Sequence, residues 1–320
     1  MKLRICRDLE ECETIWNQLW PARNLFDCWL VRSGFQRGFG RPPHFIVAES
    51  KGRLVGFLPL SLIEEEDYYG FFPGETWQGK TWLEQNRIPA GSVGVRHELW
   101  EAAPENTWLR YLDDGSASAL GDKTVDEVGY VFHPSGFNYD FDAYWAGFSG
   151  KSRKKIRQEV ARLEAKGCEY HLDVFSDVEW MVETNLTNFG QLSYFHDPRF
   201  LKGFENLLSF LSQSQILRVV SIRIQGTLAA VDVGAVYRNR YTVLAGATNP
   251  QFPGIAKAIN LFHLKWGCLS RVEQIDFLCG DFGWKSRFQL HPRPLYWLSK
   301  TASDHLTTMW ADRSASLVLS

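Results

Sequence analysis

Gln251-Phe252-Pro253-Gly254-Ile255-Ala256 separates two segments of different periodicity. Residues 241–247 (YTVLAGA) are an apolar run typical of a β-strand, and residues 257–269 repeat apolar side chains at helical spacing. The first N–H groups of a helix lack intrahelical partners, and the helix dipole adds positive charge there. Gly254 would let an anion approach the backbone closely, so the stretch predicts a pyrophosphate-binding turn. An ordinary strand-to-helix turn built on Pro-Gly is the alternative interpretation.

The composition indicates a globular protein with no general affinity for polyanions. The chain has 320 residues, enough for two domains, with 45% hydrophobic and 22% charged residues. Its formal net charge of −2 predicts no strong attraction to DNA or to anionic lipid. No apolar run of signal-peptide type or of transmembrane length is found, so we expect a cytoplasmic protein without a membrane span.

Cysteine and histidine spacing gives no indication of a metal site. None of the six cysteines forms a Cys-x-x-Cys pair, and the eight histidines include no His-Glu-x-x-His arrangement. We therefore expect reduced thiols and no bound metal. The 13 tryptophans and 22 phenylalanines are interpreted as core residues, with an aromatic ligand groove as the minor alternative.

The C-terminal half predicts the order β-α-α-β-β-β-α-β-α-β after a basic helix. That helix covers residues 151–166; strands are expected at 169–175, 216–224, 228–237, 241–247, 274–279 and 295–299, and helices at 177–190, 198–213, 257–269 and 281–288. Gln225-Gly226 and Asn239 mark tight turns between strands. Trp180, Met181, Leu186 and Phe189 are expected to be buried on the 177–190 helix.

The N-terminal half reads as a degenerate copy of this arrangement. Strands are expected at residues 2–6, 44–48 and 54–63, with helices at 9–19 and 26–35 and a hairpin around Lys51-Gly52. We therefore expect an α/β (α+β) protein with two tandem lobes, each a mixed, mostly antiparallel sheet flanked by helices. The expected division is 1–145 for the degenerate lobe, 146–300 for the ligand-binding lobe and 301–320 for a tail with no readable role.

The order Gln-x-x-Gly-x-Ala at residues 251–256 resembles the acyl-CoA signature of the GCN5-related N-acetyltransferase (GNAT) family, Gln/Arg-x-x-Gly-x-Gly/Ala. The predicted element order also resembles the GNAT fold, with the glycine turn after the fourth strand. The resemblance implies an acyltransferase that uses acetyl-CoA or another acyl-CoA as co-substrate.

From about residue 139 to 299 the chain also resembles the CelD/BcsL-type acetyltransferase domain, which is related to the FemABX-like tandem fold. Three local matches carry this: Tyr144 with SRKKIRQE (residues 152–159), the Pro253-Gly254 turn, and DFLCGDFGWKSRF (residues 276–288). The last resembles the family's Asp-Phe-x-x-Gly-Asp-x-x-Tyr-Lys-x-x-Phe/Trp. Trp284 departs from the usual Tyr, and an indole N–H cannot serve as a phenolic acid. The resemblance implies a link to exopolysaccharide or cell-envelope synthesis.

The expected acyl-CoA contacts follow from the turn and from the resemblance. The pyrophosphate would lie on the N–H groups of residues 252–256, and a main-chain N–H near Leu244 or Ala245 would meet the thioester oxygen. The full predicted co-substrate set is Leu244, Ala245, Gln251, Phe252, Pro253, Gly254, Ile255 and Ala256.

Four residues are predicted to act in catalysis. Asp232 is a carboxylate within an apolar strand and is either the general base or an aspartate at the strand end that faces solvent or pairs with Arg238. Tyr241 is a possible acid for the thiolate, although a strand tyrosine more commonly packs. Asp281 and Lys285 match the family motif, but their spacing of four also suits a helix ion pair.

These observations predict an N-acyltransferase that joins an acyl group to an amine in a ternary complex, the acceptor being a small molecule or a glycan. An aminoacyl-tRNA-dependent transferase on the FemABX-like fold is the first alternative, and a silent scaffold for polysaccharide assembly is the second. The basic run at residues 151–157 (KSRKKIR) would be a solvated face, a nucleic-acid contact, or a surface for an anionic acceptor or the CoA 3′-phosphate. Acceptor identity, acyl chain length and oligomeric state are not encoded in any motif.

Overall fold

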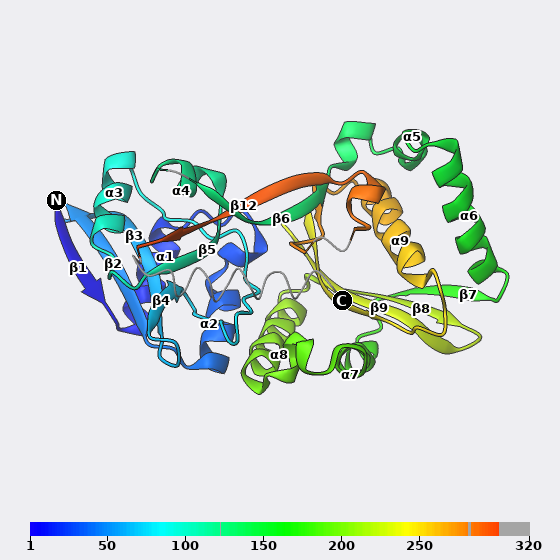
Figure 1. Cartoon of the computed structure of the whole chain (residues 1–320), viewed down its shortest axis with the longest axis horizontal. Helices are drawn as coiled ribbons and strands as arrows, with labels where there is room; N and C mark the ends of the chain where they lie inside the picture. The colour runs from blue at the N-terminus through cyan, green and yellow to red at the C-terminus, as the bar shows by residue number, and fades with distance from the viewer. Residues whose placement is uncertain (122, 281–282, 301–320) are drawn as a thin grey trace. The chain divides into compact units, whose positions relative to one another are not determined.

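The computed structural model describes residues 1–121, 123–280 and 283–300, which form two compact units (Figure 1). The first contains Met1–Gly129, Pro198–Leu207 and the described residues from Cys279 onward. The second contains Tyr130–Asp197 and Leu208–Leu278. Strand β6 (Thr124–Phe132) and helix α8 (Pro198–Gln213) contribute residues to both. The expected division at residues 145 and 300 stays a prediction.

The first unit begins with a four-stranded antiparallel sheet in the order β1-β2-β3-β4. Two helices separate its first two strands, as the sequence predicted, and β4 is an additional strand. The elements are β1 (Lys2–Cys6), α1 (Leu9–Leu19), α2 (Trp29–Phe39), β2 (Pro43–Ser50), β3 (Arg53–Ile63), β4 (Tyr68–Phe71), α3 (Val93–Glu101), β5 (Trp108–Leu112), α4 (Asp114–Ser118) and β12 (His291–Ser299). Strand β12 pairs antiparallel with β5.

Aromatic side chains fill the core of the first unit. The rings of Trp16 and Trp20 stack with centroids 4.0 Å apart, and Trp29 stacks on Phe72 at 5.2 Å. Such rings bury large apolar areas and favour stacked or edge-on contacts. The interpretation of these tryptophans as core residues is confirmed.

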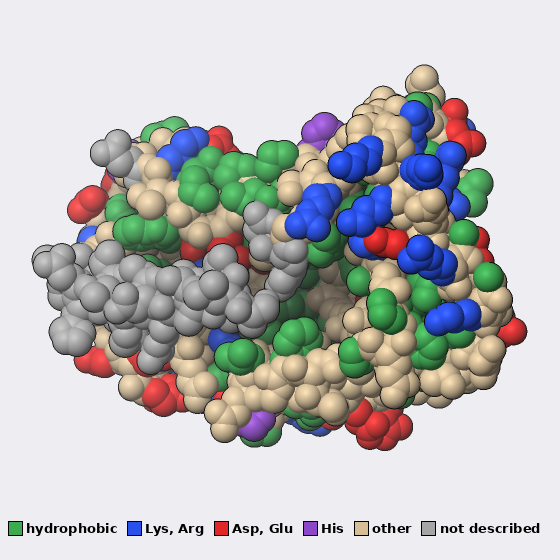
Figure 2. All heavy atoms as spheres, turned by 45° about the vertical axis from the view of Figure 1, so that its right-hand side comes forward, with side chains coloured by type: hydrophobic (Ala, Val, Ile, Leu, Met, Phe, Trp, Pro, Cys, Tyr) green, Lys and Arg blue, Asp and Glu red, His purple; other side chains and the backbone are tan. Residues whose placement is uncertain are grey.

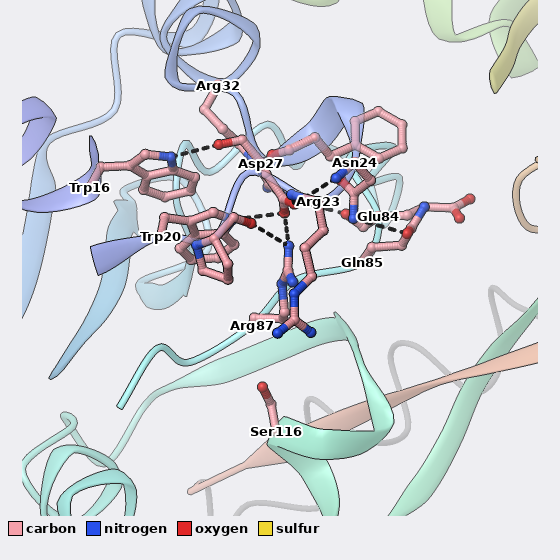
Figure 3. Close-up of polar contacts among 12 residues, drawn as sticks. Trp16, Trp20, Arg23, Asn24, Asp27, Arg32, Glu84, Gln85, Arg87 and Ser116 are labelled. Carbon is pink, nitrogen blue, oxygen red and sulfur yellow. Dashed lines mark hydrogen bonds and ion pairs between the residues drawn. The ribbon is translucent and has the colours of Figure 1, made fainter. Parts of the chain in front are cut away.

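A buried carboxylate lies beside this aromatic core (Figure 3). The Asp27 side chain is 0% exposed and forms an ion pair with Arg87 through Oδ1. Trp20 Nε1 donates to the same oxygen at 2.7 Å, and the backbone N–H groups of Arg23 and Asn24 donate to Oδ2. Both carboxylate oxygens are thus fully used, as a buried charge requires.

The second unit contains a sheet in which β10 and β11 are parallel and the other neighbours are antiparallel. Its strand order is β6-β11-β10-β9-β8-β7, and α9 and α7 cover opposite faces (Figure 1). Its elements are α5 (Phe141–Ala146), α6 (Gly150–Glu164), β7 (Cys168–Leu172), α7 (Asp177–Phe189), β8 (Leu217–Ile224), β9 (Thr227–Tyr237), β10 (Arg240–Thr248), α9 (Ile255–Leu269) and β11 (Gln274–Asp276). The two predicted tandem lobes, each with a sheet flanked by helices, are confirmed.

Local turn chemistry explains the β8–β9 and β9–β10 hairpins. Gln225 and Gly226 have φ of 51° and 79°, and Arg238 and Asn239 have φ of 49° and 60°. Positive φ at both central residues is the condition for a type I′ turn, whose twist suits the paired strands. The turns predicted at these positions are confirmed.

Of the four burial predictions on α7, only the one for Met181 is confirmed in full. Trp180 and Leu186 are half-buried, and Phe189 is 49% exposed because it ends the helix, where Gly190 turns the chain away. Among the described residues, none of the helices combines the length and apolarity that a membrane span requires. The same residues contain no group of three or more His, Cys, Asp or Glu side chains placed to hold a metal ion.

Candidate functional site

The predicted phosphate turn connects β10 to α9. Gly254 caps the helix with φ 91° and ψ −4°, a left-handed conformation that favours glycine. Glu159 of α6 lies beside it, since a Cβ added to Gly254 would be 3.7 Å from Glu159 Cβ. Glu159 also forms an ion pair with Lys257 in the first turn of α9. Helix α6 is therefore anchored next to the turn.

Backbone hydrogen bonds within the turn leave two N–H groups for a ligand. Phe252 N–H donates to Asn249 O at 3.1 Å, and Ile255 N–H donates to Phe252 O at 3.1 Å. The N–H groups of Gly254 and Ala256 donate to no backbone carbonyl of the described chain. Of the predicted contact residues, Gln251, Pro253 and Ala256 are exposed, whereas Ile255 is buried and Phe252 packs against the core.

Strands β10 and β11 separate part-way along β10. Their parallel register covers only Arg240–Thr242 opposite Gln274–Asp276, but β10 continues to Thr248. Beyond Thr242, the edge of β10 that faced β11 meets no strand of the described chain. An unpaired strand edge presents N–H and C=O groups to which an extended ligand can add.

A β-bulge lies where this opening starts. Val243 pairs with Gly234, but Ala245 already pairs with Val233, so Leu244 has no opposite residue on β9. An extra residue bends the strand and redirects its backbone groups. Both residues predicted to meet the thioester oxygen, Leu244 and Ala245, lie at this bulge.

The hydrogen bonds at the end of β10 show which of its backbone groups face the open edge. Asn249 N–H donates to Ala229 O at 2.8 Å, so alternation turns residues 245 and 247 toward β9 and residues 246 and 248 away from it. Two asparagines of α7 meet the outward carbonyls: Asn185 Nδ2 donates to Gly246 O at 3.2 Å and Asn188 Nδ2 to Thr248 O at 3.0 Å. The outward N–H groups have no strand partner among the described residues.

Three buried polar side chains from three elements form a hydrogen-bonded chain. Asp232 Oδ2 of β9 is 2.8 Å from His263 Nε2 of α9, and His263 Nδ1 is 3.1 Å from the Tyr241 hydroxyl of β10. Tyr241 and His263 are 0% exposed, whereas the Asp232 side chain is 12% exposed. The solvent-accessible end of the chain is therefore the carboxylate. Asp232 lies in the middle of β9 and not at a strand end, and no ion pair joins it to Arg238 among the described residues.

Two glycines make room for this chain. A Cβ on Gly246 would be 1.9 Å from Asp232 Oδ1, and a Cβ on Gly234 would be 2.6 Å from the Tyr241 ring. The carboxylate thus lies directly over Gly246, whose backbone borders the open edge of β10. Asp232 Oδ1 accepts no hydrogen bond from any residue that the structure describes.

Burial raises the pKa of Tyr241 well above its ordinary value, and the negative charge of Asp232 adds to this rise. The phenol therefore stays protonated at neutral pH and can donate. Because its side chain is wholly enclosed, Tyr241 is not exposed to a substrate.

Lys285 belongs to the first unit. Its side chain is buried, and Nζ donates to Cys279 O at 2.8 Å. Asp281 lies outside the described residues. The pairing of Asp281 with Lys285, and their action beside Asp232, stay predictions.

The sequence analysis missed His263. This residue is a single imidazole in the apolar stretch LFHL of α9, where most side chains are expected to pack. Its signal was the same as that of Asp232, a polar residue on a buried face. Only the register of β9 with β10 and the rotation of α9 bring the three side chains together.

A basic surface covers α6. Figure 2 shows Lys and Arg side chains gathered on this part of the second unit. The exposed cations of the helix are Lys151, Lys154, Lys155, Arg157 and Arg162. Ile156 and Leu163 are buried on the opposite face, so the helix is amphipathic as predicted.

Comparison with known families agrees with this geometry. Residues 150–286 match the family model described as the acetyltransferase (GNAT) domain. This part of the chain is therefore similar to GNAT domains. The open β10 edge, the bulge and the glycine-capped α9 all lie within the matched residues.

Solved structures resemble the whole chain and not only residues 150–286. The structure of L-PGS from Bacillus licheniformis aligns with TM-score 0.58 and 12% identity over 96% of this chain and 96% of that one. FemX aligns with TM-score 0.58 and 9% identity over 97% and 99%. A tandem GNAT protein from the clavulanic acid biosynthesis pathway aligns with TM-score 0.52 and 11% identity over 95% and 100%. At such identities the likeness shows a shared fold alone.

No curated protein sequence matches the chain significantly. The comparisons thus show similarity to a GNAT domain over residues 150–286 and a tandem fold over the whole chain, and the reaction is a matter for proposal.

Proposed function

We propose that this protein is an N-acyltransferase that transfers an acetyl or longer acyl group from acyl-CoA to an amine. The observation that carries the proposal is the continuous path from the open edge of β10 to the glycine-capped start of α9. An extended ligand with amide groups at one end and a pyrophosphate at the other fits this path, and acyl-CoA has that construction.

In this proposal the pantetheine carbonyls accept from the outward N–H groups of residues 246 and 248, as an added strand would. The pyrophosphate meets the N–H groups of Gly254 and Ala256 at the positive end of α9. The thioester oxygen meets a main-chain N–H at the bulge, from Leu244 or Ala245, where it would stabilise an oxyanion.

The chemistry then requires a base for the amine and little covalent help, since a thiolate leaves readily. Asp232 is assigned as this base because its free oxygen lies over Gly246 beside the proposed thioester site. Tyr241 is enclosed, so we assign it a supporting role through His263 instead of protonation of the thiolate. Asp281 and Lys285 enter the proposal on the motif resemblance alone. The acceptor proposed is the amino group of an amino sugar or another cell-envelope precursor.

An aminoacyl-tRNA-dependent transfer is the alternative that the basic face of α6 favours (Figure 2). Polyanion binding through such a face weakens steeply with added salt. The same face could instead meet the CoA 3′-phosphate, because Glu159 of α6 lies against the phosphate turn. A silent scaffold on the same fold would bind neither ligand.

Calorimetric titration with acetyl-CoA tests the proposal, using wild type, Gly254→Trp and Gly226→Trp. Both glycines have positive φ, but Gly226 lies in the β8–β9 hairpin and has open space around it, so it controls for backbone strain. We expect wild type and Gly226→Trp to bind and Gly254→Trp to lose binding. At ligand 100-fold above Kd, binding should stabilise the fold by about 2.7 kcal/mol. Absence of binding by wild type to acetyl-CoA and to longer acyl-CoAs would refute the proposal.

Comparison of CoA with 3′-dephospho-CoA shows whether α6 binds the 3′-phosphate of CoA or a tRNA. Lys155 and Arg162 lie four residues before and three after Glu159, on the side of α6 that faces the turn, whereas Lys154 lies on the far side. If α6 binds the 3′-phosphate, alanine at 155 and 162 removes the preference for CoA and alanine at 154 keeps it. Salt-sensitive binding of charged tRNA with no preference between the two CoA forms would favour the alternative.

A further inference from the structure

The order of the protons along Asp232, His263 and Tyr241 depends on the tautomer of His263. The Tyr241 hydroxyl has a hydrogen to donate, and its hydrogen-bond partner is His263 Nδ1. An imidazole nitrogen that accepts a hydrogen bond carries no proton, so the proton of a neutral His263 is on Nε2. That nitrogen lies 2.8 Å from Asp232 Oδ2, which accepts it as a carboxylate.

We propose that His263 is the positioning residue of the acyl-transfer site: its Nε2–H holds Asp232 Oδ2, so that Oδ1 stays directed over Gly246, and Tyr241 fixes the required tautomer. This inference rests on the proposed function in making Asp232 the base. A carboxylate held at one oxygen only keeps the other available for the incoming amine, which a fully hydrogen-bonded carboxylate cannot do.

One proton is transferred from the amine to Asp232 in the reaction step that this arrangement serves. The amine nitrogen attacks the thioester carbonyl carbon, a C–N bond forms, the C–S bond breaks and CoA leaves as the thiolate. The proton lost by the amine goes to Asp232 Oδ1, and His263 keeps its Nε2 proton throughout. Asp232 then returns its proton to the thiolate or to solvent.

Few other charges act on the chain. Arg218 of β8 and Asp173 influence Tyr241, and they form an ion pair with each other at 2.6 Å. The rings of Phe262 and Phe277 also lie beside the His263 ring. Hydrogen bonding to the charged form of a carboxylate favours that form, so the loss of His263 should make Asp232 easier to protonate.

Nitrogen-15 NMR of the histidine-labelled full chain tests the tautomer without any assay of activity. The His263 signals among the eight histidines are those absent from His263→Gln. We expect a protonated Nε2 and an accepting Nδ1 at pH 7, with the Nδ1 signal shifted in Tyr241→Phe. A ring protonated on Nδ1, or on both nitrogens, at neutral pH would overturn the inference.

The pH dependence of kcat/KM gives the second readout, measured as thiol release from acetyl-CoA with D-glucosamine as the first amine tested. His263→Phe should move the acid limb to higher pH and lower the rate at pH 7 by 10- to 100-fold, and His263→Gln, which keeps a donor, should restore part of it. An acid limb at the same pH in all three proteins would mean that His263 is only structural. If wild type does not bind acetyl-CoA but shows the expected tautomer, the proposed function fails and the proton order stands.

Discussion

Asp27 in the first unit and Asp232 in the second are both buried, but they differ in how many of their carboxylate oxygens are hydrogen-bonded. Asp27 has both oxygens engaged, by an arginine, an indole and two backbone N–H groups, and is wholly enclosed (Figure 3). Asp232 has one oxygen held by His263, and the other lies over a glycine at an open strand edge. Burial alone therefore does not mark a functional carboxylate. A functional carboxylate also keeps an oxygen that is not hydrogen-bonded and that faces the path of a ligand.

The same isosteric change at both sites should therefore have opposite consequences. Asp232→Asn still accepts from His263 but cannot take a proton. We expect transfer to fall by about 10²- to 10⁴-fold, as for loss of a general base, with acetyl-CoA binding unchanged in calorimetry. Unfolding free energy should change by only about 1 kcal/mol. Transfer at the wild-type rate in this variant would remove Asp232 from the chemistry.

Asp27→Asn should reverse this pattern. It leaves the Arg87 side chain, 11% exposed, without its counter-charge and turns an amide nitrogen toward donor groups. Breaking a buried pair in this way costs about 3–5 kcal/mol, which denaturant unfolding of the full chain would measure. Acetyl-CoA binding by the folded fraction should be kept. Equal stability of the Asp27 and Asp232 variants would mean that the two sites do not differ as described.

Substitution of Gly246 tests the space that the carboxylate occupies. A methyl group there would be 1.9 Å from Asp232 Oδ1, so the carboxylate or the strand must shift. Displacement of about 1 Å at a reacting centre can cost on the order of 100-fold, and we expect Gly246→Ala to lower kcat/KM by about 10- to 100-fold. Gly136→Ala, where a methyl meets open space, is the matched control and should be silent. A fully active Gly246→Ala would show that Asp232 need not occupy this position.

The element order could be predicted because its signals are local. Helical spacing in residues 257–269 and the Gln225-Gly226 turn depend on neighbours in sequence, and both predictions are confirmed. The exposure of Phe189 was not predictable, since apolar spacing does not reveal where a helix leaves the core.

Only part of the site could be predicted from the sequence, because some of its residues are recognisable only by contacts that are distant in sequence. Asp232 stands out as a charge in an apolar strand, whereas His263 gains its meaning from partners 31 and 22 residues away. The Asp27 cluster draws on Arg87, 60 residues away, and its aspartate lies in a short 3₁₀ helix with no distinctive pattern. Tertiary pairing of this kind is decided by register and helix rotation, which no single segment encodes.

A third carboxylate extends the comparison to the surface and gives the smallest effect. Glu65 is 52% exposed and pairs with Arg41 and with Arg199, and the hydrogen bond from Arg41 lowers its pKa to about 2. A folded-state pKa below the unfolded value of 4.5 means that the pairing stabilises the fold above pH 4.5 and that this contribution is lost as pH falls toward 2.

Solvent screens the pair, so Glu65→Gln should cost only about 0.2–1 kcal/mol at pH 7. The difference from wild type in denaturant unfolding should shrink below pH 4.5. A loss of unfolding free energy that stays constant from pH 7 to pH 3 would mean that Glu65 stabilises the fold through packing and not through its charge. Glu65 would then not be comparable with Asp27 and Asp232.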